Sequence, residues 1–517
     1  MAPVRAVRRL AVFALLAAGA AWPVSAALPA SPFPLGQSNL AEQRSSREIA
    51  PGLTVYTVQR GAAAASEWRV TAGVARTRSE RAQAVRCLRT VGLSPLTESY
   101  RAPGGQPRTY VEVISARRFP SEAAGAEVAK GARDCGLKAR AIAASPHQSL
   151  GPWRLEILEI KPSEFRGHLR AVLGHDTVFG REKPSDIARR TGALAVVNGG
   201  YFVVDATDGV EGEPAGVSVI DGQVRSEPTA DRPYLLISDG EAVAARIVTA
   251  PARPLTVRWS DGGVTPLGGV DRHPGQVRNC GVAEPGPAHR PIHDATCTLA
   301  DDLVAITSDA GFAPNLQGAT TALVGRDGRL TAGRAPGIGE ILLVATGARR
   351  AELAAKVGAG ASASIDLSAA ALTGLDAPHA SAVNGGPLLL KDGRPIRDDD
   401  GEGWSMAQAT RERANFVHDW TVLRNPRTAV GVGYDGTIWF LVVDGREFSE
   451  QSSTNEANSV GLSIEEIRSV MTHLAARDAM NLDGGGSSAL ILNGALATKP
   501  SDLTGERPVG DAIVVTP

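Results

Sequence analysis

Three short apolar runs of the chain each end in an amide or a carboxylate that glycines follow directly. The segments are Asn198-Gly199-Gly200, Asn384-Gly385-Gly386 and Asp483-Gly484-Gly485-Gly486. Glycine permits backbone conformations that are closed to other residues, and successive N–H groups in such a loop can bind an anion. A single copy would be an ordinary tight turn. Three copies predict one shared site that suits a phosphate group.

Arg427 is the candidate cation for this anion. It follows Asn425-Pro426 and precedes the apolar run 429–433. A guanidinium behind a rigid proline at the start of a strand can bind a phosphate through two N–H groups, although a lone arginine is more often a solvated surface residue. Asp444 ends the next apolar run, so it either lies at the same edge or forms only another turn.

The elements that must position these residues are short strands. Asp-Gly or Asn-Gly pairs begin at residues 221, 239, 327, 392, 435 and 493, and such pairs between apolar runs indicate β-hairpins. Helices are predicted over 184–191 and over 463–477, the second with capping-box spacing at Ser463 and Glu466. We therefore predict an α+β fold: a large mixed-sheet domain over residues 151–517, with many hairpins and few helices.

Residues 66–145 predict a separate small domain. Their pattern predicts the order strand, helix, strand, strand, helix, strand, with helices over 79–91 and 121–135. This βαββαβ order is typical of a ferredoxin-like sandwich with both helices on one face. The order and the related segments Arg69–Gly73 and Tyr110–Ile114 resemble the SPOR domains. The resemblance implies binding to the glycan strands of peptidoglycan; the alternative is a plain packing domain.

The N-terminus has the pattern of an export signal. Arg5, Arg8 and Arg9 precede the apolar run 10–21, and Val24-Ser25-Ala26 supplies small residues for cleavage. The run is shorter than the roughly 20 residues that span a bilayer. We therefore expect a signal peptide over 1–26, a flexible linker over 27–65, no transmembrane segment, and an exported protein of the periplasm, the cell envelope or the medium.

Export changes how the four cysteines are interpreted, because an exported chain meets an oxidising compartment. Nearest-neighbour pairing predicts the disulfides Cys87–Cys135 and Cys280–Cys297. A zinc site with His289 and His293 is the rival interpretation, but three prolines in the same stretch disfavour the helix that usually presents such a pair. We expect no cofactor, and the sequence leaves a divalent metal open.

The charge balance narrows the range of partners. Lys and Arg number 54 and Asp and Glu number 55, which gives a formal net charge of −1. No overall positive field exists to hold nucleic acid or an anionic membrane. An anionic ligand must therefore be bound locally.

Taken in order along the chain, the strand-end motifs resemble the phosphodiester glycosidase family. The resemblance covers residues 151–517 and rests on the segments Asn198–Phe202, Asn384–Pro387, Pro426–Ala429, Asp444-Gly445, Asn481–Ser488 and Glu506–Val509. The family includes an enzyme that removes N-acetylglucosamine from a phosphodiester to uncover mannose 6-phosphate. The resemblance implies hydrolysis of a sugar-1-phosphodiester at the glycosyl bond.

The chemistry of the residues agrees with that reaction. Cleavage passes through an oxocarbenium-like transition state and releases a phosphomonoester, which needs anion stabilisation more than protonation. Asp483 is the candidate nucleophile or base, and Glu506 is a candidate second carboxylate. The other candidate substrate contacts are Asn198, Asn384, Tyr201, Ser487, Asp444 and the glycines 199, 200, 385, 386, 484, 485 and 486, with Arg427 as the cation.

Two other classes of function also fit the sequence. A non-catalytic protein would use both domains only to bind cell-wall glycan. A phosphodiesterase would instead cut the phosphorus–oxygen bond and release a sugar phosphate. The long insert around Cys280 and Cys297 has no predicted role.

Overall fold

A computed structural model describes most of the chain. The described residues are 28–62, 68–101, 109–137, 139–142, 150–230, 232–249, 253–281, 291–373, 379–397, 400–404, 411–445 and 459–517. The predicted signal peptide and His289 lie outside these ranges. Among the described residues, no helix combines the length and the apolar character that crossing a membrane requires.

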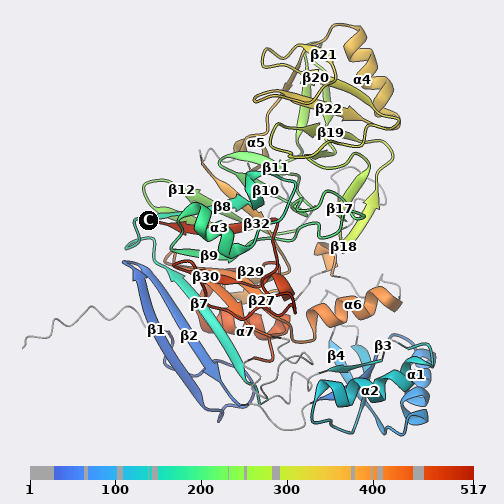
Figure 1. Cartoon of the computed structure of the whole chain (residues 1–517), viewed down its shortest axis with the longest axis vertical. Helices are drawn as coiled ribbons and strands as arrows, with labels where there is room; N and C mark the ends of the chain where they lie inside the picture. The colour runs from blue at the N-terminus through green and yellow to red at the C-terminus, as the bar shows by residue number, and fades with distance from the viewer. Residues whose placement is uncertain are drawn as a thin grey trace, which may run out of the picture.

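Two packed sheets form the centre of the molecule (Figure 1). The larger has eight strands in the order β1 (Glu42–Ala50), β2 (Leu53–Arg60), β7 (Trp153–Ile160), β28 (Ile438–Val443), β27 (Arg427–Gly433), β29 (Ala476–Asn481), β25 (Leu388–Lys391) and β26 (Arg394–Pro395). The smaller has five, in the order β31 (Ala495–Leu496), β30 (Leu490–Leu492), β9 (Ala195–Asn198), β32 (Asp511–Thr516) and β8 (His168–Leu173).

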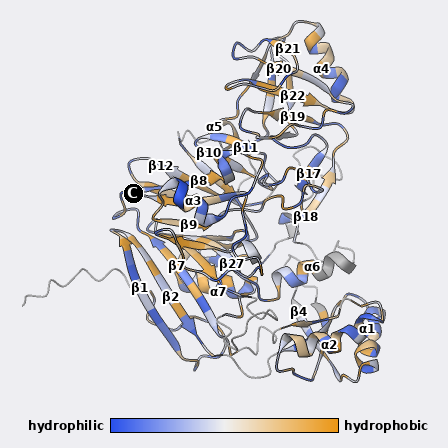
Figure 2. Cartoon of the chain, viewed as in Figure 1, coloured by the Kyte–Doolittle hydropathy of each residue, from blue (hydrophilic) through white to orange (hydrophobic). Residues whose placement is uncertain are grey.

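The apolar core lies between these sheets and defines their buried faces. Leu158, Val430 and Met480 of the larger sheet pack with Val197 and Ile513 of the smaller one, and all five are fully or almost fully buried. Figure 2 shows the hydrophobic residues along these strands. The edge strand β1 is instead hydrophilic and mostly exposed, a composition that protects an open sheet edge from pairing with another chain.

The expectation of a flexible linker over residues 27–65 is corrected by this sheet. β1 pairs with β2, and β2 pairs with β7 from Leu53↔Ile160 to Arg60↔Trp153. Apolar residues such as Val55 and Val58 point into the two cores on either side of the sheet. The abundance of Ala, Pro and Ser before these strands obscured an alternating β pattern within them.

The two predicted helices of the large domain are present. α3 (Pro184–Thr191) has the predicted bounds and ends at Gly192, which adopts the left-handed conformation. α7 (Ile464–His473) starts with the predicted capping box, since Ser463 and Glu466 each accept a backbone hydrogen bond from the other. It ends four residues earlier than predicted, because Ala475 has a positive φ of 56° and β29 begins at Ala476.

A third sheet joins the core to a module at the far end of the molecule. Its order is β11 (Gln223–Ser226), β10 (Ser218–Ile220), β24 (Ser381–Asn384), β12 (Tyr234–Asp239) and β13 (Val243–Val248). The distal module, at the top of Figure 1, consists of β15 (Val264–Pro266), β14 (Thr256–Trp259), β23 (Ala363–Ile365), β16 (Gly269–Val270), β19 (Leu303–Ile306), β22 (Ile341–Ala345), β20 (Thr320–Val324), β21 (Leu330–Ala332), α4 (Arg349–Gly358) and α5 (Ala369–Thr373).

All six turn dipeptides lie where hairpins were predicted. They connect β10 to β11, β12 to β13, β20 to β21, β25 to β26, β27 to β28, and β30 to β31. A further hairpin, β17 (Gln276–Cys280) with β18 (Pro291–Thr298), belongs to the insert and carries the predicted disulfide Cys280–Cys297.

The small domain has the predicted order of elements. These are β3 (Arg69–Ala75), α1 (Arg78–Thr90), β4 (Pro95–Arg101), β5 (Thr109–Ser115), α2 (Glu122–Arg133) and β6 (Arg140–Ile142), and the sheet order β4-β5-β3-β6 is that of a ferredoxin-like sandwich. The predicted disulfide Cys87–Cys135 connects α1 to the end of α2. A final helix, α6 (Arg411–Thr421), lies between this domain and the eight-stranded sheet (Figure 1).

Candidate active site

The three predicted strand ends meet at one place. Asn198 ends β9, Asn384 ends β24, and Asp483 follows β29 by two residues. The Asn198 side-chain amide donates to the Asp483 carbonyl at 2.9 Å and accepts from the Thr428 hydroxyl at 2.7 Å. Segments that are far apart along the chain therefore form one cluster, as the sequence predicted.

Asn384 and Tyr201 connect the other two strand ends. The Asn384 amide accepts from the Tyr201 N–H at 2.9 Å and donates to the Tyr201 carbonyl at 3.1 Å. The Tyr201 hydroxyl donates to the Gly386 carbonyl at 2.6 Å and accepts from the Asn481 amide at 2.9 Å. Both asparagines thus hold backbone in place, whereas the sequence predicted contacts to substrate oxygens.

The glycines of the three loops are needed for close packing. A Cβ atom on Gly199 would lie 2.3 Å from an Asp511 carboxylate oxygen, and one on Gly200 would lie 2.6 Å from the Asn384 amide nitrogen. Five loop N–H groups already donate to protein oxygens, those of Gly199, Gly200, Gly386, Gly484 and Gly485. These five N–H groups stabilise the loops, whereas the sequence predicted that they would bind an anion.

Asp483 is the carboxylate at the centre of the cluster. Its side chain accepts from the Gly484 N–H at 2.8 Å, and the residue keeps a partly accessible surface. Burial raises its pKa to about 6, although the nearby Ser487 hydroxyl, the Arg507 guanidinium and the Gly484 N–H all favour the charged form. A carboxyl with this pKa can gain or lose a proton near neutral pH, as general acid–base catalysis requires.

Asp511 is a second carboxylate beside Asp483, and the sequence analysis missed it. It begins β32, is 1% exposed, and accepts from the Gly200 N–H through Oδ1 at 2.8 Å. Its Oδ2 atom is buried without a hydrogen-bond partner among the described residues. Burial, together with the negative charge of Asp483, raises its pKa to about 7. The sequence signal that could have found it is an acidic residue directly after Gly510, at the start of the apolar run 512–515.

Arg427 lies beneath the cluster and is almost fully buried. Its Nε donates to the Leu462 carbonyl at 3.0 Å, and its Nη2 donates to the carbonyl of Trp420. The guanidinium also lies over the Trp420 ring, 4.5 Å from the ring centroid. Its charge reaches Tyr201, whose pKa is well above the usual value because of burial and the charge of Asp483. These backbone contacts fix the guanidinium, whereas the sequence predicted bidentate contact with phosphate.

Arg507 is a further cation near Asp483, and it belongs to the predicted closing motif without having been singled out. Its charge lowers the pKa of Asp483, and its side chain is 29% exposed. Asp502 holds the guanidinium through Nε at 2.7 Å and Nη2 at 3.0 Å. It packs directly against Gly486, where a Cβ atom would lie 2.3 Å from Nη2. Arg507 is therefore both fixed and reachable.

Glu506 and Asp444, two of the remaining predicted residues, accept hydrogen bonds from backbone N–H groups. Glu506 accepts from the Ser185 N–H at 2.6 Å and so caps the start of α3. Asp444 accepts from the Lys499 N–H at 2.9 Å. Ser487 is buried in the turn that follows Asp483. Glu506 thus caps the N-terminus of α3, whereas the sequence predicted it as a second carboxylate for the reaction.

An aromatic cluster borders the site. Tyr201 lies 4.6 Å from His293 and 5.9 Å from Trp404, and Trp404 stacks on Trp420 at 4.1 Å between ring centroids. His293 comes from the β17–β18 hairpin, and the charge of its neighbour Asp294 raises the pKa of Asp483. The insert, for which the sequence predicted no role, therefore forms one side of the site.

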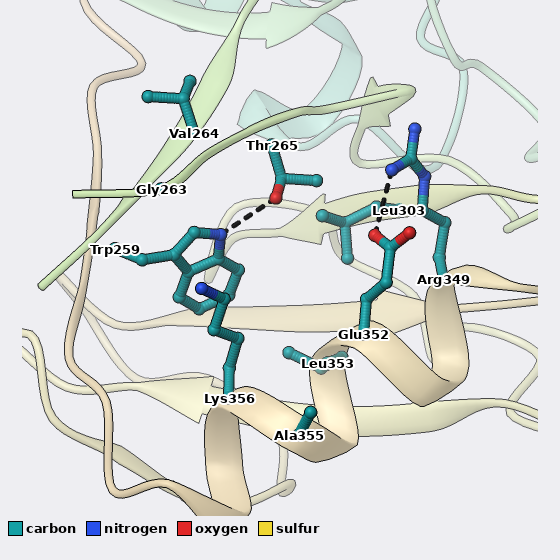
Figure 3. A pocket seen from close by; sticks show the side chains of 10 residues that line it. All are labelled: Trp259, Gly263, Val264, Thr265, Leu303, Arg349, Glu352, Leu353, Ala355 and Lys356. Atoms are coloured by element: carbon teal, nitrogen blue, oxygen red, sulfur yellow. Dashed lines mark hydrogen bonds and ion pairs between the residues drawn. The ribbon is translucent and has the colours of Figure 1, made fainter. Parts of the chain in front are cut away.

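A separate pocket lies in the distal module. Figure 3 shows this cavity of about 330 Å³, which is lined by Trp259, Leu303 and residues of α4. Four of its polar groups form two pairs: Trp259 Nε1 donates to Thr265 at 2.9 Å, and Arg349 binds Glu352 at 2.9 Å. The predicted site residues do not line it.

A metal centre is not evident in the described part of the chain, where no group of three or more His, Cys, Asp or Glu side chains could hold an ion. Cys280 and Cys297, which the zinc interpretation required, form a disulfide instead. His293 packs in the aromatic cluster. The cysteines are therefore structural.

The structure shows mixed sheets whose strand ends meet at a carboxylate. Comparison with known proteins shows which family these features resemble. Residues 303–516 match the family model of the phosphodiester glycosidases. The chain is 30% identical over 120 residues to the N-acetylglucosamine-1-phosphodiester alpha-N-acetylglucosaminidase of Mus musculus, and 36% identical over 95 residues to that of Bos taurus. These matches cover 23% and 18% of this chain but only 19% and 16% of the two relatives.

Solved structures extend the likeness to almost the whole chain. A candidate exported protein of Burkholderia pseudomallei has a TM-score of 0.80 and 28% identity, over 95% of this chain and 99% of that one. A hypothetical protein of Synechocystis has a TM-score of 0.50 and 16% identity, over 93% and 81% of the two chains, which shows the fold alone. The arrangement of the small and large domains is therefore shared with another chain.

Proposed function

We propose that this protein is a hydrolase that cleaves the glycosyl bond of a sugar-1-phosphodiester. The observation that carries the proposal is the position of Asp483, a partly accessible carboxylate with a pKa raised to about 6, at the point where three glycine-rich strand ends meet. The family match over residues 303–516 and the names of the two mammalian relatives support the same reaction.

The chemistry assigns one task to each side of the scissile bond. Asp483 acts at the anomeric carbon, as the nucleophile or as the base for water, while the bond from that carbon to the phosphate oxygen breaks. Water supplies the new oxygen of the sugar, and the electron pair of the broken bond leaves with the phosphomonoester. Asp511 holds the Gly199-Gly200 loop, and the charge of Asp483 helps to raise its pKa.

Arg507 is the cation that we assign to the departing phosphate. It is held by Asp502, keeps part of its side chain accessible, and acts electrostatically on Asp483. Arg427 adds positive charge from below, where backbone carbonyls fix it. Preorganised cations of this kind stabilise an anion without having to reorganise during the reaction.

Hydrolysis of a panel of sugar-1-phosphodiesters in ¹⁸O-labelled water tests the proposal. We expect free sugar carrying the label, and unlabelled phosphomonoester. Label in the phosphate would instead show cleavage of the phosphorus–oxygen bond, and binding without turnover would show a glycan-binding protein. Asp483→Asn should lower kcat by about 10³-fold or more while it preserves ligand binding.

Asp221→Asn is the matched control for this substitution. The Asp221 side chain is 75% exposed and pairs with His379 in the β10–β11 turn. Its amide variant should hydrolyse the substrate at the wild-type rate. Equal losses in both variants would contradict the role of Asp483.

We also propose that the protein is exported and that the small domain binds peptidoglycan glycan. Two disulfides and the likeness to the Burkholderia protein support export, and the ferredoxin-like order supports the choice of domain. Fractionation of cells that produce the full chain tests the first point. Co-sedimentation with purified peptidoglycan tests the second, and recovery of the protein in the supernatant would contradict it.

A further inference from the structure

The small domain uses one face of its sheet to hold α6. Val70 and Ala72 of β3 pack against α1 and α2 in the domain's own core. A bulge between Thr71 and Val74 changes the register of β3, and Val74 packs instead against Val417 of α6. Helices thus cover both faces of this sheet, two from its own domain and one from the large domain.

Polar side chains border this apolar contact. The ring Nε2 of His418 lies 3.6 Å from the Glu112 carboxylate, and both side chains are 1% exposed. Glu112 also accepts from the Thr71 hydroxyl at 2.6 Å. At the rim of the contact, Arg140 of β6 forms an ion pair with Asp419 of α6.

The opposite side of the last turn of α6 faces the active site. Trp420, two residues beyond His418, accepts from Arg427 through its carbonyl and lies under the same guanidinium with its ring. The carbonyl of Asp419 accepts from the Asn425 amide at 2.9 Å, which fixes the chain just before Arg427. Residues two apart on a helix point in nearly opposite directions, so one turn of α6 contacts both the domain and the site.

We propose that the small domain is a positioning element of the active site. Glu112 and Arg140 act as positioning residues: they fix α6, and α6 fixes Trp420 and thereby the Arg427 guanidinium. The inference rests on the proposed function for its activity measurement. A ligand that occupied the same sheet face would have to displace α6, so it would compete with the arrangement of Arg427.

A charge exchange across the contact tests this inference in the full chain. Arg140→Asp faces Asp419 with a like charge, and Asp419→Arg faces Arg140 with a like charge. Each should lower kcat/KM by about tenfold and raise KM, because Arg427, displaced by about 1 Å, no longer adds its positive charge to the site from the arranged position. The double variant restores opposite charges and should recover activity to within about threefold of wild type. Simple loss of folded protein would lower kcat at unchanged KM and would not be rescued.

Arg81→Asp is the matched control, because it makes the same charge change in α1, on the other face of the sheet, where Arg81 is exposed. It should leave kcat/KM unchanged. Wild-type kinetics in Arg140→Asp, or equal losses in Arg140→Asp and Arg81→Asp, would overturn the inference.

Amide hydrogen exchange separates this inference from the proposed function, since it needs no substrate. Exchange at residues 416–428 should be faster in Arg140→Asp than in wild type and should return to wild-type rates in the double variant. If the wild-type protein hydrolyses no sugar-1-phosphodiester, the proposed function is contradicted. The exchange rates still test whether the small domain positions α6. Unchanged exchange in Arg140→Asp would overturn it.

Discussion

Two clusters of carboxylates in this chain differ in their partners. At the junction with the distal module, the fully buried Arg272 binds Asp302 at 2.6 Å and Glu227 at 2.5 Å. Burial disfavours the charge of Arg272, but these two carboxylates outweigh it and raise its pKa above the usual value. At the strand ends, Asp483 and Asp511 have pKa values raised to about 6 and about 7, and each accepts a hydrogen bond from a backbone N–H group.

This difference shows that pairing with a cation, and not burial alone, distinguishes a structural carboxylate cluster from a reactive one. A carboxylate with a cation in contact holds the fold through that ion pair, whereas a buried one without such a cation can have a pKa raised toward neutral pH. A raised pKa is also insufficient. Asp271 reaches about 7 as well, but both of its oxygens bind Thr307, at 2.6 and 2.8 Å, and it lies away from the strand ends.

The largest effect should follow from removing the cation of the paired cluster. Arg272→Met leaves the buried Asp302 and the partly buried Glu227 without their shared cation, which should lower the free energy of unfolding by about 3–5 kcal/mol. Urea denaturation of the variant and the wild type measures this loss. The kcat of the remaining folded protein should be unchanged, because the cluster lies outside the active site. A loss below about 1 kcal/mol would contradict the structural role.

Asp511→Asn should change the pH dependence of stability in the unpaired cluster. The pKa of Asp511 is raised, so between about pH 4 and pH 7 the folded state keeps a proton that the unfolded state has lost. The stability of the wild type therefore falls as pH rises through this window. The amide keeps the Gly200 hydrogen bond but does not titrate, so the fall should be smaller by about 2–4 kcal/mol, at ~1.4 kcal/mol per pKa unit. Parallel stability curves at pH 4 to 8 would contradict this assignment.

The same contrast explains what could be predicted from the sequence. Strand ends, hairpins and both disulfides depend on local patterns, and Asp483 was found because glycines mark its loop. Asp511 was missed because its role arises from β32 pairing with β9, a contact between residues more than 300 positions apart. The linker prediction failed for a related reason, since β1 and β2 are stabilised by pairing with the distant β7.

The roles of Asn198, Asn384 and Arg427 show a second limit. Their types suit substrate binding, and the sequence placed them correctly at the strand ends. Most of the acceptors and donors that engage them are backbone groups of other segments, such as the carbonyls of Trp420 and Leu462 around Arg427. Contacts with backbone groups cannot be predicted from residue types. In the sequence, a residue that stabilises a site therefore looks the same as one that contacts substrate.

The pH dependence of catalysis should show a smaller effect of the same pair. Because Asp483 must be ionised to act, kcat/KM should rise with pH around a midpoint of about 6. Asp511→Asn should leave this midpoint nearly unchanged, because Asp511, whose pKa is raised to about 7, still holds its proton there. Asp221→Asn, with its exposed carboxylate, should keep the wild-type midpoint. A wild-type midpoint near 4 would show that Asp483 is not desolvated in solution.

The smallest effect should come from an ion pair that is neither buried nor part of a site. Arg349 and Glu352 lie 2.9 Å apart at the rim of the distal pocket, with side chains 22% and 54% exposed (Figure 3). Solvent screens such a pair, so Glu352→Gln should change the free energy of unfolding by less than about 0.5 kcal/mol. Measured by the same urea denaturation as Arg272→Met, the two variants should differ several-fold. Equal losses would mean that burial does not set the strength of ion pairs in this protein, and the contrast between its carboxylate clusters would then need another cause.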